Sequence, residues 1–264
     1  MKRGLNRAEA VILNSFDYGE SDRILTFYTL EYGKIKGIAK GARRSKRRFV
    51  GNLEPTSLVR IIFFHSDKSD LVRVDDATLL EGYNTLKADI DLLSHGCYFV
   101  ELASELTREG VALPHVFRLL AGFLKMLDAG AEPGPLARFF EVRLLSMAGY
   151  LPHLSGCVVC KSPGGESIKR FSSERGGAVC SPCSSNLPGL HSLSPATAAT
   201  LNLSMKLDAE KLQRLKVAPS FVEESERLLY DFIRHQIGKE LKTKKFIEKM
   251  KSAELARETA FKRA

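Results

Sequence analysis

The 264-residue sequence lacks any apolar run long enough to cross a membrane. Its apolar runs are short, such as IIFF at residues 61–64, whereas a membrane-spanning helix needs about 20 such residues. The first residues, MKRGLNRAEAVILNSF, lack the apolar stretch and the cleavage site of a secretory signal. We therefore expect a soluble, cytoplasmic protein with no membrane partner.

Recognisable catalytic motifs are absent as well. None of the six histidines stands in an H-x-E or H-E-x-x-H pattern. There is also no nucleophile elbow, no glycine-rich phosphate loop and no paired-carboxylate motif. Asp89 and Asp91 lie close together, but at an expected helix start, where acidic residues are favourable. We therefore expect no catalytic residues and no enzymatic activity.

Acidic residues are missing between Glu31 and Glu54, although the chain contains 31 of them. The net charge is +9, and the excess is concentrated in residues 1–84 (net +4) and 194–264 (net +5). A basic segment without acids favours a polyanion such as nucleic acid, while a solvated loop without a partner is the simpler alternative. The basic residues of this stretch are Lys34, Lys36, Lys40, Arg43, Arg44, Lys46, Arg47 and Arg48.

Phe49 closes the basic stretch, and two roles stay open for it. Proteins that bind single strands combine a positive groove with aromatic rings on which bases stack, so Phe49 could be such a ring. Equally, it could anchor the returning loop on the core. Replacement by alanine distinguishes them: a stacking ring predicts a loss of affinity selective for single strands, and an anchor predicts lower thermal stability with little selectivity.

The first eighty residues predict five strands and a small barrel. Segments 10–16, 24–30, 34–40, 57–66 and 71–80 are short, rich in Val, Ile, Phe, Tyr and Thr, and separated by turn residues. In the third strand, a period of two puts Lys34, Lys36 and Lys40 on one face, which we expect to look at solvent or a ligand.

From about residue 85 the apolar residues follow helical spacing, for example at 119–127, 136–147 and 228–237. Residues 153–193 interrupt this pattern and are rich in Ser, Gly, Pro and Cys. Beyond Lys239 the charges alternate in sign, which indicates an exposed helix or a fraying end. The predicted domains are a barrel at 1–82, a helical domain at 83–152 and 194–250, a cysteine-containing insertion at 153–193 and a charged tail at 251–264.

Four of the five cysteines form two pairs, Cys157/Cys160 and Cys180/Cys183. This C-x2-C spacing lets two thiolates from one tight turn bind the same ion, so the pattern predicts one structural Zn²⁺. Four thiolates leave no open position for an activated water. The alternatives are redox or buried cysteines, and His153 as a replacement ligand.

Several motifs, in this order, resemble the RecO family of bacterial DNA repair and recombination proteins. They are YGESDRILTFYTLEYGKIKGIAKGARRSKRRFVGNLEPTSL, CYFVELASELTREG, FFEVRLLSMAGYLPHLSGCVVC, CSPC and LLYDFIRHQIGKELKTKKFI. The resemblance covers residues 8 to 250. It departs from the family between residues 41 and 56, where the usual barrel has a helix and this sequence shows no helical pattern.

The resemblance implies an α+β, multidomain fold: an N-terminal oligonucleotide/oligosaccharide-binding (OB) barrel, and a C-terminal all-α domain with an inserted four-cysteine zinc finger. It implies a recombination mediator that binds single- and double-stranded DNA, anneals complementary strands, and is nucleoid-associated when bound. The implied partners are RecR, the acidic C-terminal tail of the single-stranded-DNA-binding protein and, indirectly, RecA. For that tail we expect apolar contacts and five basic residues: Arg227, Arg234, Lys242, Lys244 and Lys245.

Two rival functions share features with this interpretation. An RNA-binding OB-fold protein with a zinc ribbon has the same composition, and only the order of the motifs speaks against it. A zinc-dependent nucleic-acid hydrolase or deaminase would need an open metal position and a nearby glutamate, neither of which the motifs supply.

Overall fold

The computed structural model describes residues 1–49, 51–164 and 167–261, with side chains as far as residue 253. By their internal contacts these residues form two compact units. The first comprises Met1–Gly130 and the segment that starts at Leu241, and the second is Ala131–Glu240. Residues 165–166 of the predicted insertion and 262–264 of the predicted tail lie outside the described residues.

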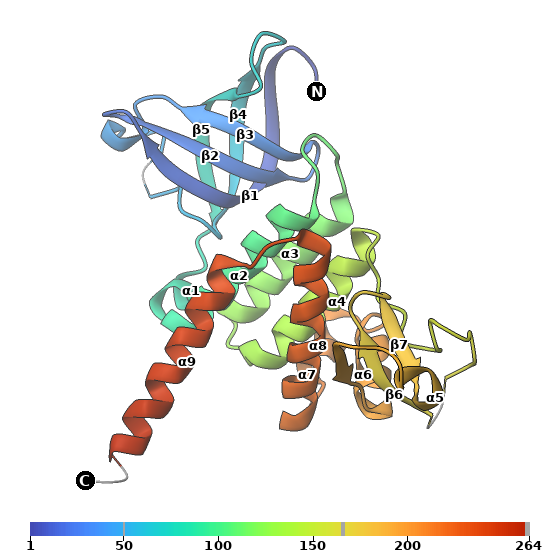
Figure 1. Cartoon of the computed structure of the whole chain (residues 1–264). Helices are drawn as coiled ribbons and strands as arrows, with labels where there is room; N and C mark the ends of the chain where they lie inside the picture. The colour runs from blue at the N-terminus through green and yellow to red at the C-terminus, as the bar shows by residue number, and fades with distance from the viewer. Residues whose placement is uncertain (50, 165–166, 262–264) are drawn as a thin grey trace. The chain divides into compact units, whose positions relative to one another are not determined.

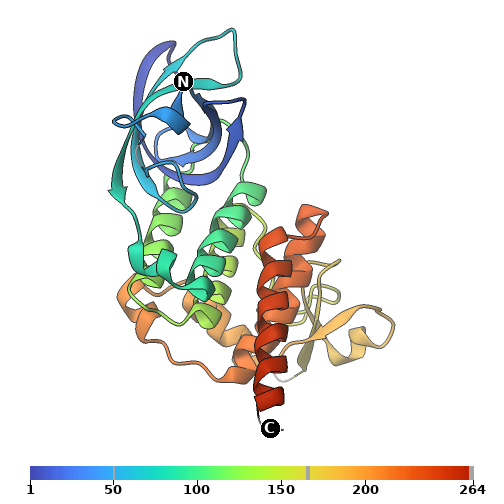
Figure 2. The same ribbon diagram turned by 90° about the vertical axis from the view of Figure 1, so that its left-hand side faces the viewer.

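The first unit begins with the predicted five-stranded barrel, whose strands curl round to close on themselves (Figures 1 and 2). The strands are hydrogen-bonded in the order β1-β2-β3-β5-β4, and β4 pairs with β1 to complete the OB-type barrel. The pairing of β3 with β5 is parallel and the other pairings are antiparallel. The strands are β1 (Gly4–Tyr18), β2 (Asp22–Thr29), β3 (Gly33–Ala39), β4 (Leu58–His65) and β5 (Val72–Glu81).

Alternate residues of each strand fill the barrel core, because neighbouring side chains in a strand point to opposite faces. In β3, Ile35 and Ala39 lie in the core, whereas Lys36 is exposed. The β-branched and aromatic residues that favour strands in the first eighty residues thus also form one continuous apolar core. Its other members include Ala8, Ala10, Ile12, Leu25, Phe27, Val59, Ile61, Phe63, Val72 and Val74.

At Gly37, β3 runs too close to β5 for a side chain. A Cβ there would lie 2.8 Å from Cγ2 of Val74 and 3.0 Å from Cγ2 of Val72. We expect Gly37→Ala to lower the free energy of unfolding by about 1–3 kcal/mol, the usual cost of overpacking. The matched control is Gly122→Ala in α3 (Pro114–Asp128), where a Cβ meets nothing within 4 Å. It should raise the free energy of unfolding by about 0.5–1 kcal/mol, because glycine weakens a helix. Urea unfolding of both variants measures this, and a shift of the same sign in both would contradict it.

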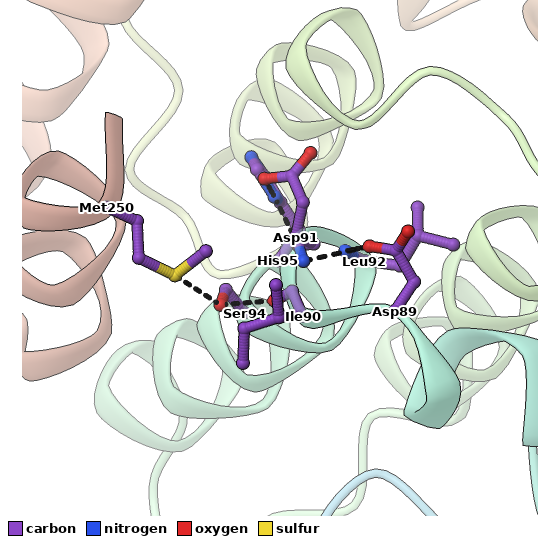
Figure 3. A network of polar contacts seen from close by, with 7 residues as sticks. All are labelled: Asp89, Ile90, Asp91, Leu92, Ser94, His95 and Met250. Atoms are coloured by element: carbon purple, nitrogen blue, oxygen red, sulfur yellow. Dashed lines mark hydrogen bonds and ion pairs between the residues drawn. The ribbon is translucent and has the colours of Figure 1, made fainter. Parts of the chain in front are cut away.

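Three further helices belong to the first unit: α1 (Asn84–Ala88), α2 (Ile90–Leu106) and α9 (Lys242–Phe261). Asp89 caps α2, because its carboxylate accepts the N–H groups of Asp91 and Leu92 at 2.9 and 3.0 Å. Figure 3 shows this cap and the contact of Ser94 Oγ with the sulfur of Met250, which lies 3.5 Å away on α9.

The beginning of α9 is packed against α2. The carboxylate of Glu101 on α2 accepts the N–H groups of Lys242 and Thr243, each at 2.9 Å, and so caps α9 from another helix. Leu241 and Ile247 are buried. Of the two alternatives expected beyond Lys239, the segment forms the helix, with Lys242, Lys245 and Glu248 exposed. Its first turns do not fray, because the apolar residues Leu241 and Ile247 anchor them.

The second unit combines helices with a small sheet. Its helices are α4 (Pro133–Met147), α5 (Ser181–Ser184), α6 (Pro195–Ser204), α7 (Ala209–Arg214) and α8 (Pro219–Ile237). The strands β6 (Ile168–Ser172), β7 (Gly177–Cys180) and β8 (Leu190–Ser192) form a sheet in the order β7-β6-β8. Helix α8 packs against α4 and α6, and the ring of Phe232 on α8 meets that of Phe171 on β6 at 5.8 Å.

The change from strands to helices falls between Glu81 and Asn84, and the long helices α3, α4 and α8 coincide with the predicted helical segments. Among the residues that the structure describes, none of the helices combines the length and the apolar character that a membrane span requires.

Candidate nucleic-acid interface and candidate metal centre

The segment that joins β3 to β4, residues 40–57, is called the basic loop here. It is fastened at its start to the β1–β2 turn. Gly41, with a φ of 67°, donates its N–H to the carboxylate of Asp22 at 2.8 Å, and Arg43 donates its N–H to the carbonyl of Ser21 at 2.9 Å. The Gly41 N–H and the Ser21 hydroxyl hold the pKa of Asp22 below its usual value. Among the described residues of the loop, only Ala42–Arg44 form a short 3-10 helix, in keeping with the missing helical pattern.

The loop is fastened again where it returns to the barrel. Phe49 is 4% exposed and belongs to the barrel core, while the guanidinium of Arg48 lies 5.0 Å from the centre of its ring. Arg48 donates to the carbonyls of Lys40 (3.1 Å) and Asp75 (3.4 Å). Of the two roles left open for Phe49, the structure therefore favours the anchor, because a buried ring offers no face to a base.

The lysines on the outer face of β3 are only partly available to solvent or a ligand. The ammonium of Lys34 donates to the carbonyls of Ser104 and Thr107, the latter at 2.6 Å, and so caps the C-terminal end of α2. Lys36 forms an ion pair with Glu109 at 2.5 Å. The expectation that this face meets solvent or a ligand is therefore wrong for Lys34, whose charge binds backbone carbonyls.

The remaining basic residues of the loop are exposed. Arg43 lies 3.4 Å from Asp17, and Arg44 lies 3.5 Å from Glu20; exposed pairs of this kind contribute little and are easily exchanged. Lys46 and Arg47 form no ion pair with any residue that the structure describes. The charge available to a polyanion is thus concentrated between the two anchors of the loop.

Sequence reasoning missed two basic residues beside this loop. Arg23 on β2 pairs in register with Ala39 and contacts Asp17 at 3.1 Å. Arg73 on β5 pairs in register with Ile38 and contacts Asp75 at 2.8 Å. Both lie at the end of β3 where the basic loop begins. Arg73 lies in the predicted strand 71–80 and Arg23 directly precedes the predicted strand 24–30, but the nearby acidic residues Asp22 and Asp75 kept either from standing out as part of a basic cluster.

The basic residues expected to hold an acidic tail lie on two helices, α8 and α9. On α8, Arg227 pairs with Glu223 at 3.4 Å and Arg234 pairs with Asp231 at 2.9 Å. On α9, Lys244 is buried, so its side chain is not offered to a partner. Three of the five expected residues are therefore already paired or buried within the protein: Arg227, Arg234 and Lys244.

The four paired cysteines come together in the second unit. The Sγ atoms of Cys157, Cys160, Cys180 and Cys183 all lie within 4.8 Å of one another, and His153, the alternative ligand, is not in this group. Sulfurs bound to one zinc ion at about 2.3 Å lie about 3.8 Å apart. The distance from Cys160 to Cys180 is 3.7 Å, so the donor set and its spacing fit a tetrahedral ion.

Backbone turns set this spacing. The carbonyl of Cys157 accepts the N–H of Lys161 at 3.0 Å, and Lys161 has a positive φ of 62°. The N–H of Cys180, at the end of β7, points at the sulfur of Cys157 at 3.4 Å. Burial alone would raise the pKa of Cys157, but the N–H groups of Cys180, Cys160 and Val159 outweigh it and lower that pKa to about 6. Hydrogen bonding to Cys180 raises the pKa of Cys183 to about 12. Thiols this close resist ionising together, and a bound cation removes that conflict.

Comparison with known proteins places both parts of the chain in one family. Residues 1–83 match the model for the N-terminal part of recombination protein O, and residues 87–245 match the model for its C-terminal part. The chain is 35% identical to the DNA repair protein RecO of Anaeromyxobacter sp. (strain K) over 243 residues, covering 91% of this chain and 94% of the relative. It is 36% identical to that of Myxococcus xanthus (strain DK1622), covering 90% and 95%. For that of Syntrophus aciditrophicus (strain SB) the identity is 32%, with 94% and 97% covered. The chain therefore belongs to the recombination protein O family.

Proposed function

We propose that this protein acts in DNA repair and recombination by binding single- and double-stranded DNA through its barrel. Family membership supports the role. The single observation that supports the site is the basic loop, which is anchored at both ends and exposes Lys46 and Arg47 between the anchors. Lys40, Arg43 and Arg44 complete the proposed contact set, whereas Lys34, Arg48 and Phe49 support the fold.

The proposed mechanism is electrostatic. Cationic side chains of the basic loop neutralise backbone phosphates, and the release of condensed counterions drives binding. Phosphate contacts carry no sequence information, so two complementary strands can be held without preference until they pair. We propose that the protein anneals strands in this way and, together with RecR, helps RecA replace the single-stranded-DNA-binding protein. This is a binding function and needs no catalytic residue. Its location would be the cytoplasm, at the nucleoid when DNA is bound.

We propose that Cys157, Cys160, Cys180 and Cys183 hold one structural zinc ion. Bound there, the ion would neutralise the thiolates and contribute its binding free energy to the folding of the surrounding segment. The cysteines themselves link the turn at residues 157–161 to the end of β7 and to α5.

For the acidic tail of the single-stranded-DNA-binding protein, the second unit offers a cavity of about 350 Å³ beside α4 and α7. Its lining includes the apolar residues Leu136, Phe139 and Leu212 and two residues of opposite charge, Lys216 and Glu132. An acidic peptide with an apolar end fits this combination, because the apolar end fills the cavity and the lysine meets the charge. We propose this cavity in place of the scattered basic residues of α8 and α9.

An annealing assay tests the proposed function. We expect the protein to accelerate pairing of complementary DNA strands, both bare and covered with the single-stranded-DNA-binding protein. Covering protein without its acidic tail should abolish acceleration on covered strands and leave bare strands unaffected. Lys216→Glu, which reverses the exposed positive charge at the cavity, should reproduce that selective loss.

Three outcomes would count against the proposal. No acceleration on bare DNA strands would contradict annealing. Acceleration confined to RNA strands would favour the RNA-binding alternative. Strand cleavage would indicate an enzyme.

A further inference from the structure

Large apolar side chains stand exposed on the outer face of the barrel, away from its core. Phe16 and Tyr18 are 47% and 55% exposed near the end of β1, and Leu5 and Phe64 are exposed on β1 and β4. Exposed apolar side chains that gather into one patch mark an interaction site. The register of the strands decides whether these side chains form such a patch.

The register places them in one row that runs around the closed barrel, so only neighbouring members of the row lie side by side. Residues that are directly paired across neighbouring strands point to the same face, with their Cβ atoms about 5 Å apart. Because the strands of a closed barrel are tilted, the row leaves β1 near its end and returns to β1 near its beginning. Its members, in order of pairing, are Phe16, Ile24, Ile38, Arg73, Phe64 and Leu5.

One cation, Arg73, is a member of this row, and the basic loop lies beside one end of it. The guanidinium of Arg73 lies 5.3 Å from the centre of the Phe64 ring. Tyr18, two residues beyond Phe16 and on the same face, is paired in register with Asp22, whose carboxylate holds the N–H of Gly41. The exposed rings of β1 therefore lie beside the start of the basic loop.

Rings next to a positive loop favour single-stranded DNA over a protein or lipid partner. Stacked bases of a duplex are hidden from side chains, whereas an unpaired base offers its face to a ring while the phosphates meet the cations. A purely apolar partner would leave the exposed cations of the neighbouring basic loop, Lys46 and Arg47, without a contact.

Resting on the proposed function, we propose that Phe16 and Tyr18 form a stacking surface for unpaired bases. The basic loop captures phosphates of any DNA, and these rings add the preference for single strands. They take the stacking role that the buried Phe49 leaves unfilled.

The test compares Phe16→Ala and Tyr18→Ala with the wild type on an oligothymidylate and on a blunt duplex. Loss of a stacked base should weaken binding to the single strand about 5- to 150-fold. Duplex affinity and the salt dependence should stay unchanged, because no phosphate contact is lost. The matched control is Phe246→Ala on α9, whose ring is 48% exposed and which should bind as the wild type does.

A ring substitution separates stacking from mere apolar contact. The sequence contains no tryptophan, so Phe16→Trp introduces a single tryptophan at the proposed surface, whose emission can be excited apart from that of the seven tyrosines. Its emission should be quenched by the oligothymidylate and not by the duplex, with affinity retained, whereas Phe16→Leu should lose affinity as alanine does.

Two outcomes would overturn the inference: wild-type affinity in Phe16→Ala, or an equal loss on single strands and duplex. Both leave the proposed function standing if the wild type binds DNA in a salt-dependent way. Absence of DNA binding by the wild type would overturn the proposed function itself.

Discussion

Replacing Lys40, Arg43, Arg44, Lys46 and Arg47 together with alanine should abolish most of the salt-dependent affinity for DNA of any sequence. Each phosphate contact on a single strand contributes about −0.7 to the log–log salt slope, so five lost contacts should flatten it by about 3.5. Between about 50 and 200 mM salt, wild-type affinity should therefore fall about 100-fold more than that of the variant. Fluorescence anisotropy titrations at several salt concentrations measure both quantities, and annealing should decline with them.

The fold should survive this change, because the two anchors of the loop remain. Arg48 binds the carbonyl of Lys40, which alanine retains, and Phe49 stays in the core. A matched control replaces five exposed cations of the second unit with alanine: Lys169, Lys206, Lys211, Arg214 and Arg227. Two of these, Lys211 and Arg227, form exposed ion pairs, as Arg43 and Arg44 do in the loop. The control changes the net charge equally and should keep most of the slope. An unchanged slope in the folded loop variant would exclude the loop as the DNA site.

Freshly purified, reduced protein should carry one equivalent of zinc, and Cys160→Ser should lose it. Apparent binding free energies of structural zinc sites are about 10–16 kcal/mol, and they act as folding energy of the surrounding segment. We therefore expect lower thermal stability and faster amide exchange around residues 157–161 and at Cys180, whose N–H points at the sulfur of Cys157. DNA binding should persist, because the basic loop belongs to the first unit. Elemental analysis and hydrogen exchange measure these effects.

Cys97→Ser provides the control for the zinc experiment. Cys97 is a half-buried cysteine on α2, outside the cluster, so the variant should retain the full equivalent of metal. Protein without metal in elemental analysis would contradict the proposal. Unchanged stability after replacement of all four clustered cysteines would do so too.

The barrel and the cysteine cluster could be predicted because their signals are local. A strand such as β3 shows its two faces in consecutive residues, and the C-x2-C spacing of Cys157 and Cys160 requires only one turn. The role of each cation could not be predicted in the same way. Lys34 and Lys46 look equivalent in the sequence, but Lys34 reaches carbonyls of α2, about 70 residues further along the chain.

The exposed aromatic residues were missed for a related reason. Phe16 and Tyr18 are typical strand residues, and the period of two that puts them on one face does not tell which face is outside. A bulge between Ile12 and Asn14 shifts the register just before them, so extending the pattern from the core residue Ile12 puts Phe16 inside. The pairing of Phe16 with Ile24 and its 47% exposure show that it points outward.

The cap that Glu101 places on α9 has a consequence for the order of folding during synthesis. The surface of α2 that receives α9 is made before residue 107, but its partner starts at Lys242. At translation rates of about 5–20 residues per second, the ribosome needs roughly 5–20 s to pass through residues 131–240. During that interval Ser94 and Glu101 stand without their partners on α9. The nascent barrel is thus finished early, the second unit follows, and the first unit is completed last.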